Sequence, residues 1–120
     1  SAASDVYKRQ VGAYDSYLLA KIAMAEAGNQ DTEGKALVML VVLNRAWGDN
    51  EFPDTVEDVI YDDGQFSPVL EGKFEQTIPN KDCWDALEMV MQGWDESEGA
   101  LYFESNCWRE QFSHQAVPGI

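Results

Sequence analysis

The stretch LAKIAMAEAG, residues 19–28, sets both the fold and the candidate chemistry of this chain. Side chains advance by about 100° per residue in an α-helix, so Leu19, Ile22, Ala23 and Glu26 fall on one face. That face is otherwise apolar, and the spacing therefore places the carboxyl group of Glu26 on the side of the helix that packs against the protein. Gly28 is a suitable terminator for this helix.

Two effects are expected to raise the pKa of Glu26. Burial disfavours the charged form of a carboxyl group, and the negative end of the helix dipole near Gly28 acts in the same direction. A carboxyl group that keeps its proton near neutral pH can serve as the general acid in glycoside cleavage. The same periodicity also fits a structural alternative, in which Glu26 is exposed or paired with a Lys or Arg from elsewhere.

The rest of the sequence predicts a mostly helical single domain of the α+β class. Apolar periodicity and capping residues predict helices over about residues 16–27, 33–47, 56–60 and 82–92, the first three capped by Asp15 or Ser16, Asp31 or Thr32, and Thr55. Residues 61–79 are rich in Gly and Pro and are predicted to form turns that line a groove. Within them, residues 65–67 are predicted to pair with residues 100–103 in a small β-sheet.

Composition restricts the possible partners. The chain has 120 residues, 22 acidic and 8 basic side chains and a formal net charge of -14, so we expect one domain that does not bind nucleic acid. The longest apolar run, residues 36–43, is much shorter than the roughly 20 residues of a membrane helix, so no membrane span is predicted. We expect the protein to be a monomer.

The cysteines leave two possibilities open. Cys83 and Cys107 could form a disulfide in an exported protein, or both could be free and buried. Together with His114 they make a poor zinc site, and the acidic loops lack the spacing of a calcium site. The prediction is therefore a protein without a metal or a cofactor.

Six short motifs resemble the catalytic domain of the SleB-type cell wall hydrolases. In chain order they are AEAG (25–28), EG (33–34), VVLNR (41–45), FP (52–53), GQFSPV (64–69) and GALYF (99–103). Each is weak alone, but their order and spacing over residues 16–108 make the resemblance specific. It implies a lysozyme-like, lytic transglycosylase-like domain that cleaves the glycan strands of peptidoglycan outside the cytoplasm, in several members those of the spore cortex.

The resemblance assigns Glu26 as the essential acid and base. In a lytic transglycosylase one Glu protonates the glycosidic oxygen and then takes the proton of the muramoyl C6 hydroxyl as a 1,6-anhydro ring closes. Glu33 is the alternative partner carboxylate, because a tight helix-loop-helix would bring it near Glu26. The candidates for substrate binding are Gln65, Tyr102 and Asn44 through polar groups and Phe66 and Phe103 through flat rings. Asn44 could instead cross-link a helix end, and both Phe could simply fill the core.

The chain departs from the family pattern in two places. Gln30 occupies the position of a second Glu in the family's Glu-Ala-x-Gly-Glu run, and residues 111–120 do not reproduce the family's Gly-x-His-x-Phe-Tyr ending. These departures keep open one rival, a noncatalytic peptidoglycan-binding domain of the same fold. A third alternative is an acidic protein-interaction domain.

The first ten residues are expected to be foreign to the domain. They lack the apolar segment of a signal peptide, and residues 5–10 (DVYKRQ) resemble a translated transposase sequencing adapter. The expected domain therefore covers residues 11–120. Because residues 111–120 differ from the family pattern, the domain is expected to be truncated or frame-shifted at this end.

Overall fold

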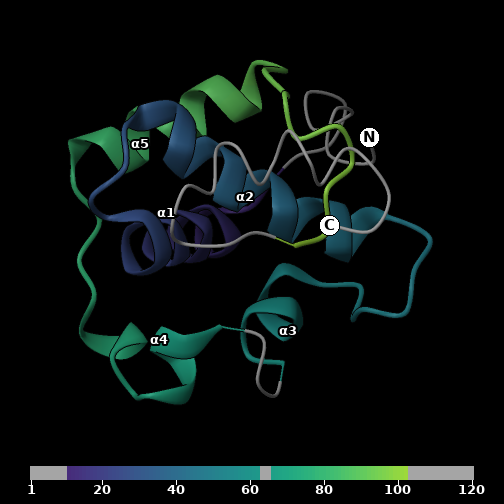
Figure 1. Cartoon of the computed structure of the whole chain (residues 1–120), viewed down its shortest axis with the longest axis horizontal. Coiled ribbons are helices and arrows are strands. Elements are labelled where there is room, and N and C mark those ends of the chain that lie inside the picture. Colours follow the sequence, from purple (N-terminus) through teal and green to yellow (C-terminus); the bar gives the residue numbers. More distant parts are fainter. Residues whose placement is uncertain (1–10, 63–65, 103–120) are drawn as a thin grey trace.

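The computed structural model describes residues 11–62 and 66–102, and helices joined by loops make up this part of the chain. The elements are α1 (Ala13–Ala27), α2 (Thr32–Trp47), α3 (Val56–Ile60), α4 (Ser67–Leu70), the 3₁₀ helix η2 (Phe74–Gln76) and α5 (Lys81–Met91) (Figure 1). The four helices expected from the periodicity are therefore present, and α4 and η2 lie in the segment predicted to consist of turns.

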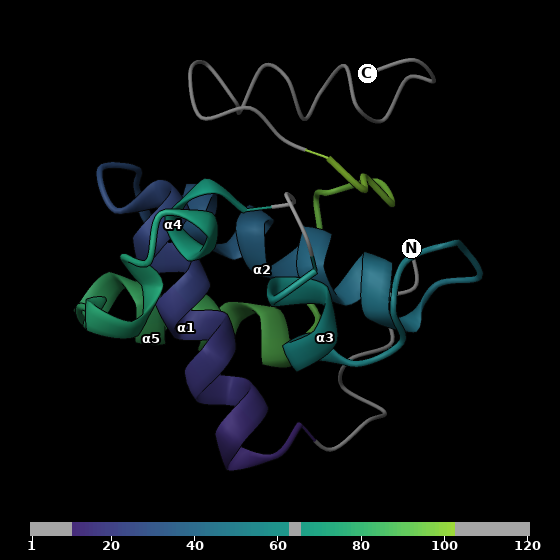
Figure 2. The same ribbon diagram turned by 90° about the horizontal axis from the view of Figure 1, so that it is seen from below.

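Helix α2 is the centre of the fold. Every residue from 34 to 46 is buried, because the apolar run of this helix has no polar face and must be covered on all sides. Helices α1, α3 and α5 all pack on it. Helix α5 lies on one side of the α1–α2 pair and α3 and α4 lie on the other (Figure 1), and the view from below shows α1 crossing α2 (Figure 2).

Side-chain caps fix the starts of three helices. Asp31 Oδ1 accepts a hydrogen bond from the backbone N–H of Gly34 at 2.8 Å, and Thr55 Oγ1 accepts one from Asp58 at 3.1 Å. Both caps confirm predictions from the sequence. Asn80 caps α5 in the same way. The predicted cap of α1 is wrong, because the helix begins at Ala13 with Gly12 as its N-cap.

The predicted small β-sheet is wrong, since residues 11–62 and 66–102 contain no strand. Residues 67–70 form α4 instead, with a hydrogen bond from the N–H of Val69 to the carbonyl of Phe66 at 3.1 Å. Pro68 favours this outcome, because its φ angle suits the first turn of a helix, where its missing N–H has no intrahelical partner. The described part of the chain is thus helical rather than α+β.

The other half of the predicted sheet is held by side chains of α2. Asn44 Nδ2 donates to the carbonyl of Ala100 at 3.0 Å, and Arg45 Nε donates to the carbonyl of Leu101 at 2.7 Å. The N–H of Ala100 donates to the carbonyl of Ser97 in a turn. Backbone groups that a strand would need for pairing are therefore already bonded.

Lys35 joins the start of α2 to the end of α1. Its side chain is 1% exposed, and its ammonium group donates to the carbonyls of Gly28, at 3.3 Å, and Gln30. These carbonyls lie at the C-terminal end of α1, where helix carbonyls lack intrahelical donors and the helix dipole favours a cation. The contact fixes the loop between the two helices.

We expect Lys35→Met to lower the free energy of unfolding by about 1–3 kcal/mol, because two partly buried carbonyls lose their donor. Urea denaturation followed by circular dichroism measures this change. Lys81→Met is the control, since Lys81 is exposed and pairs with Asp85 on the surface of α5, where a salt bridge is worth about 1 kcal/mol or less. Equal stability of the two variants would contradict the role given to Lys35.

Candidate active site

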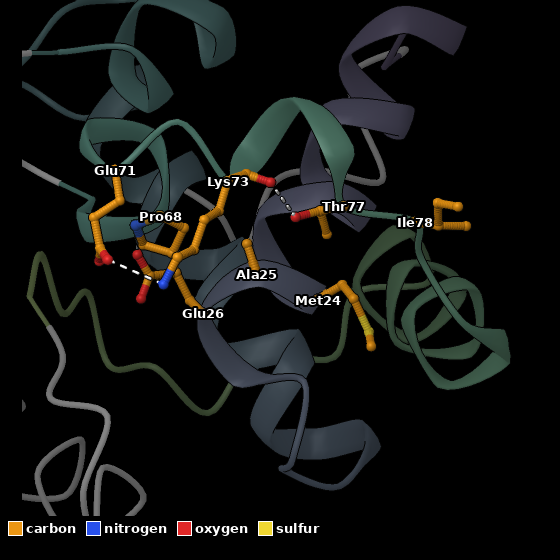
Figure 3. A pocket seen from close by; sticks show the side chains of 8 residues that line it. All are labelled: Met24, Ala25, Glu26, Pro68, Glu71, Lys73, Thr77 and Ile78. Atoms are coloured by element: carbon orange, nitrogen blue, oxygen red, sulfur yellow. Dashed lines mark hydrogen bonds and ion pairs between the residues drawn. The ribbon is translucent and has the colours of Figure 1, made fainter.

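A pocket of about 540 Å³ lies between the end of α1 and the segment that runs from α4 past η2. It is lined by Met24, Ala25 and Glu26 from α1 and by Pro68, Glu71, Lys73, Thr77 and Ile78 (Figure 3). Five of these residues come from the segment of residues 61–79, so the prediction that this segment lines a groove is confirmed.

Glu26 lies in the last turn of α1 and is partly buried in the pocket wall. Burial, which disfavours the charged carboxylate, and the nearby negative charge of Glu71 raise its pKa to about 7. The predicted rise in the pKa of Glu26 is therefore confirmed, with desolvation as the larger cause. Its carboxyl group can be protonated or ionised near neutral pH, as a group that both gives and takes a proton must be.

Glu71 is the second carboxylate of the pocket, and it forms an ion pair with a lysine. Lys73 Nζ lies 3.0 Å from Glu71 Oε2, and both side chains remain more than half exposed. Glu33, which the sequence suggested as the partner carboxylate, is exposed in the first turn of α2 and does not line this pocket. Sequence reasoning missed Glu71, although it lies in the predicted groove segment.

The pocket has a charged end and an apolar end. The charged groups of Glu26, Glu71 and Lys73 lie together, whereas Met24 and Ile78 lie toward the opposite end (Figure 3). Ile78 is 79% exposed, an unusual position for a large aliphatic side chain. A sugar ring also presents polar edges and an apolar face, so a pocket of this kind suits a glycan.

Asn44 and Phe66 occupy structural positions. Asn44 is buried and donates to Ser97 Oγ and the carbonyl of Ala100, both at 3.0 Å, so it cross-links α2 to the segment before residue 102. Phe66 is 2% exposed and packs in the core, where its ring lies 5.2 Å from the guanidinium of Arg45. These contacts fit the structural alternatives, but Asn44 also lines a second pocket of about 280 Å³, and substrate contacts by Asn44 and Phe66 stay predictions.

Tyr102 is half exposed and is not among the residues that line the pocket. Its ring packs edge-on against Phe52, with centroids 5.8 Å apart, and the guanidinium of Arg45 lies 5.3 Å from its centroid. Gln65 and Phe103 lie outside the described residues. Substrate contacts by Tyr102, Gln65 and Phe103 stay predictions.

The remaining predictions concern metals, membranes and cysteines. Within the described ranges, no group of three or more His, Cys, Asp or Glu side chains is arranged to hold a metal ion. Over the same ranges, no helix has the length and apolar character needed to span a membrane. Cys83 is buried, with Sγ 3.8 Å from Met24 Sδ, and Cys107 lies outside the described residues, so their pairing stays untested.

Comparisons with known proteins identify the family of this chain. The family model for cell wall hydrolases matches residues 29–118. Spore cortex-lytic enzymes from Oceanobacillus iheyensis, Bacillus subtilis and Bacillus cereus are 36%, 35% and 33% identical to this chain over 89 residues. The aligned region is 74% of this chain and 32%, 28% and 34% of those proteins. No solved structure gives a significant match.

The chain belongs to the cell wall hydrolase family. It spans about a third of the length of the spore cortex-lytic enzymes that it matches. Glu26 precedes the first residue matched by the family model, so its assignment depends on the pocket, its ionisation and the AEAG motif.

A titration tests the ionisation of Glu26. Its pKa is raised in the folded protein, so the folded state binds more protons than the unfolded state between about pH 4.5 and 7, and stability falls as pH rises through this window. We expect the ¹³C carboxyl resonance of Glu26 to titrate near pH 7. We also expect Glu26→Gln to unfold at higher urea concentration than the wild type above pH 7, with the difference shrinking toward pH 4.5.

Glu88→Gln is the matched control, because Glu88 is exposed on α5 and does not line the pocket. It should leave the pH dependence of stability unchanged. A Glu26 resonance that titrates near pH 4.5 would contradict the account of the pocket.

Proposed function

We propose that this domain cleaves the glycan strands of peptidoglycan, with Glu26 as a general acid and base. The observation that carries the proposal is the partly buried Glu26 in an open pocket, with a pKa of about 7. The family and the spore cortex-lytic relatives support a cell wall substrate. Such a substrate lies outside the cytoplasm, in the cell wall or the spore cortex.

The first step is proton donation. Protonated Glu26 gives its proton to the glycosidic oxygen that joins N-acetylmuramic acid to N-acetylglucosamine, and the C–O bond on the muramoyl side breaks as positive charge develops on the sugar. Because burial disfavours the ionised carboxylate, a useful fraction of Glu26 is still protonated near neutral pH. The nearby carboxylate of Glu71 favours the protonated form as well.

The second step returns the proton. The ionised carboxylate of Glu26 accepts the proton of the muramoyl C6 hydroxyl while the oxygen attacks C1, which closes the 1,6-anhydro ring and restores protonated Glu26. One carboxyl group is sufficient for this cycle. If water takes the place of the C6 hydroxyl, the same group acts as the base and the product has a reducing end.

We expect Glu26→Gln to reduce the release of muropeptides from purified sacculi by at least about 100-fold, because the amide cannot donate the proton. Binding to sacculi should be retained, since the amide is nearly the same size. Chromatography of the soluble products measures release, and a sedimentation assay measures binding. Release by Glu26→Gln at the wild-type rate would refute the proposal, and sacculus binding by an inactive wild type would favour a noncatalytic binding domain.

Mass spectrometry of the wild-type products separates the two reaction types. A 1,6-anhydro end lacks one water relative to a reducing end. We expect the anhydro product, and a reducing end would assign the domain as a hydrolase that uses the same acid.

The exposed side chain of Ile78 provides a test of the apolar end of the pocket. We expect Ile78→Ser to raise KM for soluble glycan fragments several-fold with little change in kcat, because it removes apolar contact area from the pocket. Ile78→Leu should behave like the wild type. Since Ile78 is 79% exposed, neither variant should change the urea midpoint. An unchanged KM for Ile78→Ser would remove this residue from the substrate site.

A further inference from the structure

The charged end of the pocket contains more than the acid. Glu26, Glu71 and Lys73 are the charged residues among those that line it, and the carboxylate of Glu71 is held by the ammonium of Lys73 at 3.0 Å. No ion pair or hydrogen bond links Glu26 to a described residue. Figure 3 shows the three side chains gathered at the same end of the pocket.

We propose that the Glu71–Lys73 pair controls the protonation of Glu26: Glu71 keeps the proton on Glu26, and Lys73 limits this effect by pairing with Glu71. The inference rests on the proposed function, in which Glu26 is the acid. Glu71 and Lys73 are positioning residues in this scheme, because they act through Glu26 and take no part in bond breaking.

The other charged groups around the end of α1 are engaged elsewhere. On α2, the ammonium of Lys35 donates to the carbonyls of Gly28 and Gln30, and Glu33 does not line the pocket. On α1, the ammonium of Lys21 lies over the ring of Phe74 at 4.6 Å, away from the pocket lining. On η2, the carboxylate of Glu75 accepts a hydrogen bond from the hydroxyl of Tyr61 at 2.6 Å.

Helix α5 presents no charge to the pocket. None of its residues lines the pocket, and its contact with the lining residue Met24 is made by Cys83, a buried thiol whose Sγ lies 3.8 Å from Met24 Sδ. Lys81 and Asp85 pair with each other on the outer surface of this helix at 2.7 Å. Among the described residues, Glu71 and Lys73 are therefore the charged groups that line the pocket together with Glu26, and a substitution of either one changes the charge near its carboxyl group.

The electrostatics of Glu26 agree with this geometry. Desolvation is the larger cause of its raised pKa, and Glu71 is the charged group that adds to it. The two substitutions should therefore act in opposite directions. Removing the charge of Glu71 favours ionisation of Glu26, whereas removing the charge of Lys73 leaves Glu71 uncompensated and opposes it.

The experiment measures kcat/KM on soluble glycan fragments as a function of pH for Glu71→Gln and Lys73→Gln. The limb at high pH reports ionisation of the acid in the free enzyme. We expect this limb to move to lower pH in Glu71→Gln and to higher pH in Lys73→Gln, each by about 0.5 pH unit, because both charges are partly screened by solvent. The ¹³C resonance of Glu26 should move in the same two directions without substrate.

The matched control is the exposed pair on α5. Asp85→Asn and Lys81→Gln remove the same kinds of charge at a similar ion pair outside the pocket, and they should leave both the pH profile and the Glu26 titration unchanged. Shifts in one direction for both pocket variants, or no shift in either, would overturn the inference.

Other outcomes separate this inference from the proposed function. Loss of activity at every pH in Glu71→Gln, as large as the loss in Glu26→Gln, would make Glu71 a reacting group and overturn its positioning role. If Glu26→Gln keeps full activity while the Glu26 resonance still shifts as expected in the pocket variants, the proposed function fails and the electrostatic role of the pair stands.

Discussion

The buried ammonium group of Lys35 is the constraint on which the site depends. A buried lysine is tolerated only when its charge meets polar partners, and the carbonyls of Gly28 and Gln30 provide them. These carbonyls follow directly after the last turn of α1, so the contact holds that turn against α2. Glu26 belongs to this turn, and the carbonyls, rather than its carboxylate, take up the charge of Lys35. The carboxyl group of Glu26 therefore enters the pocket without a cationic partner among the described residues.

The opposite wall of the pocket depends on a tight turn after α4. Gly72 has a φ angle of 77°, which a residue with a side chain adopts only with strain, and its N–H donates to the carbonyl of Val69 at 3.1 Å. The next N–H, of Lys73, donates to the carbonyl of Pro68 at 2.8 Å. This is the usual way in which a glycine ends a helix and reverses the chain. It places Glu71 and Lys73 on either side of the glycine, and both side chains line the pocket.

The sequence predicted the elements that depend on local interactions. The helix periodicities and the Asp31 and Thr55 caps follow from residues close together in the chain. The periodicity also placed Glu26 on the packed face of its helix, but the burial and the charge of Glu71 that raise its pKa come from the fold. The prediction of a sheet was wrong because contacts between residues far apart in the sequence determine the conformation of those segments. The carbonyls of residues 100 and 101 accept hydrogen bonds from the side chains of Asn44 and Arg45, and no local sequence pattern predicts such bonds.

The partner carboxylate shows the same limit. Glu33 follows Glu26 closely in sequence, but it lies in the first turn of α2 and does not line the pocket, whereas Glu71 reaches the pocket through the turn after α4. The short sequence distance predicted Glu33 as the partner carboxylate of Glu26, but the fold of residues 61–79 brings Glu71 into the pocket instead. A Gly- and Pro-rich segment indicates that a groove is present, but only its backbone path determines which of its side chains enter that groove.

A pKa of about 7 gives the single-carboxyl scheme its physical basis. At a pH near this value both forms of Glu26 are well populated, so in the proposed cycle the same group is available first as the acid and then as the base. A fully exposed glutamate would be almost entirely ionised at this pH and would rarely donate. A glutamate paired with Lys35 would have a still lower pKa and would be ionised at neutral pH, because a nearby cation favours the charged carboxylate. Keeping that ammonium on backbone carbonyls and placing Glu71 in the facing wall are therefore parts of one electrostatic arrangement, which keeps a proton available on Glu26.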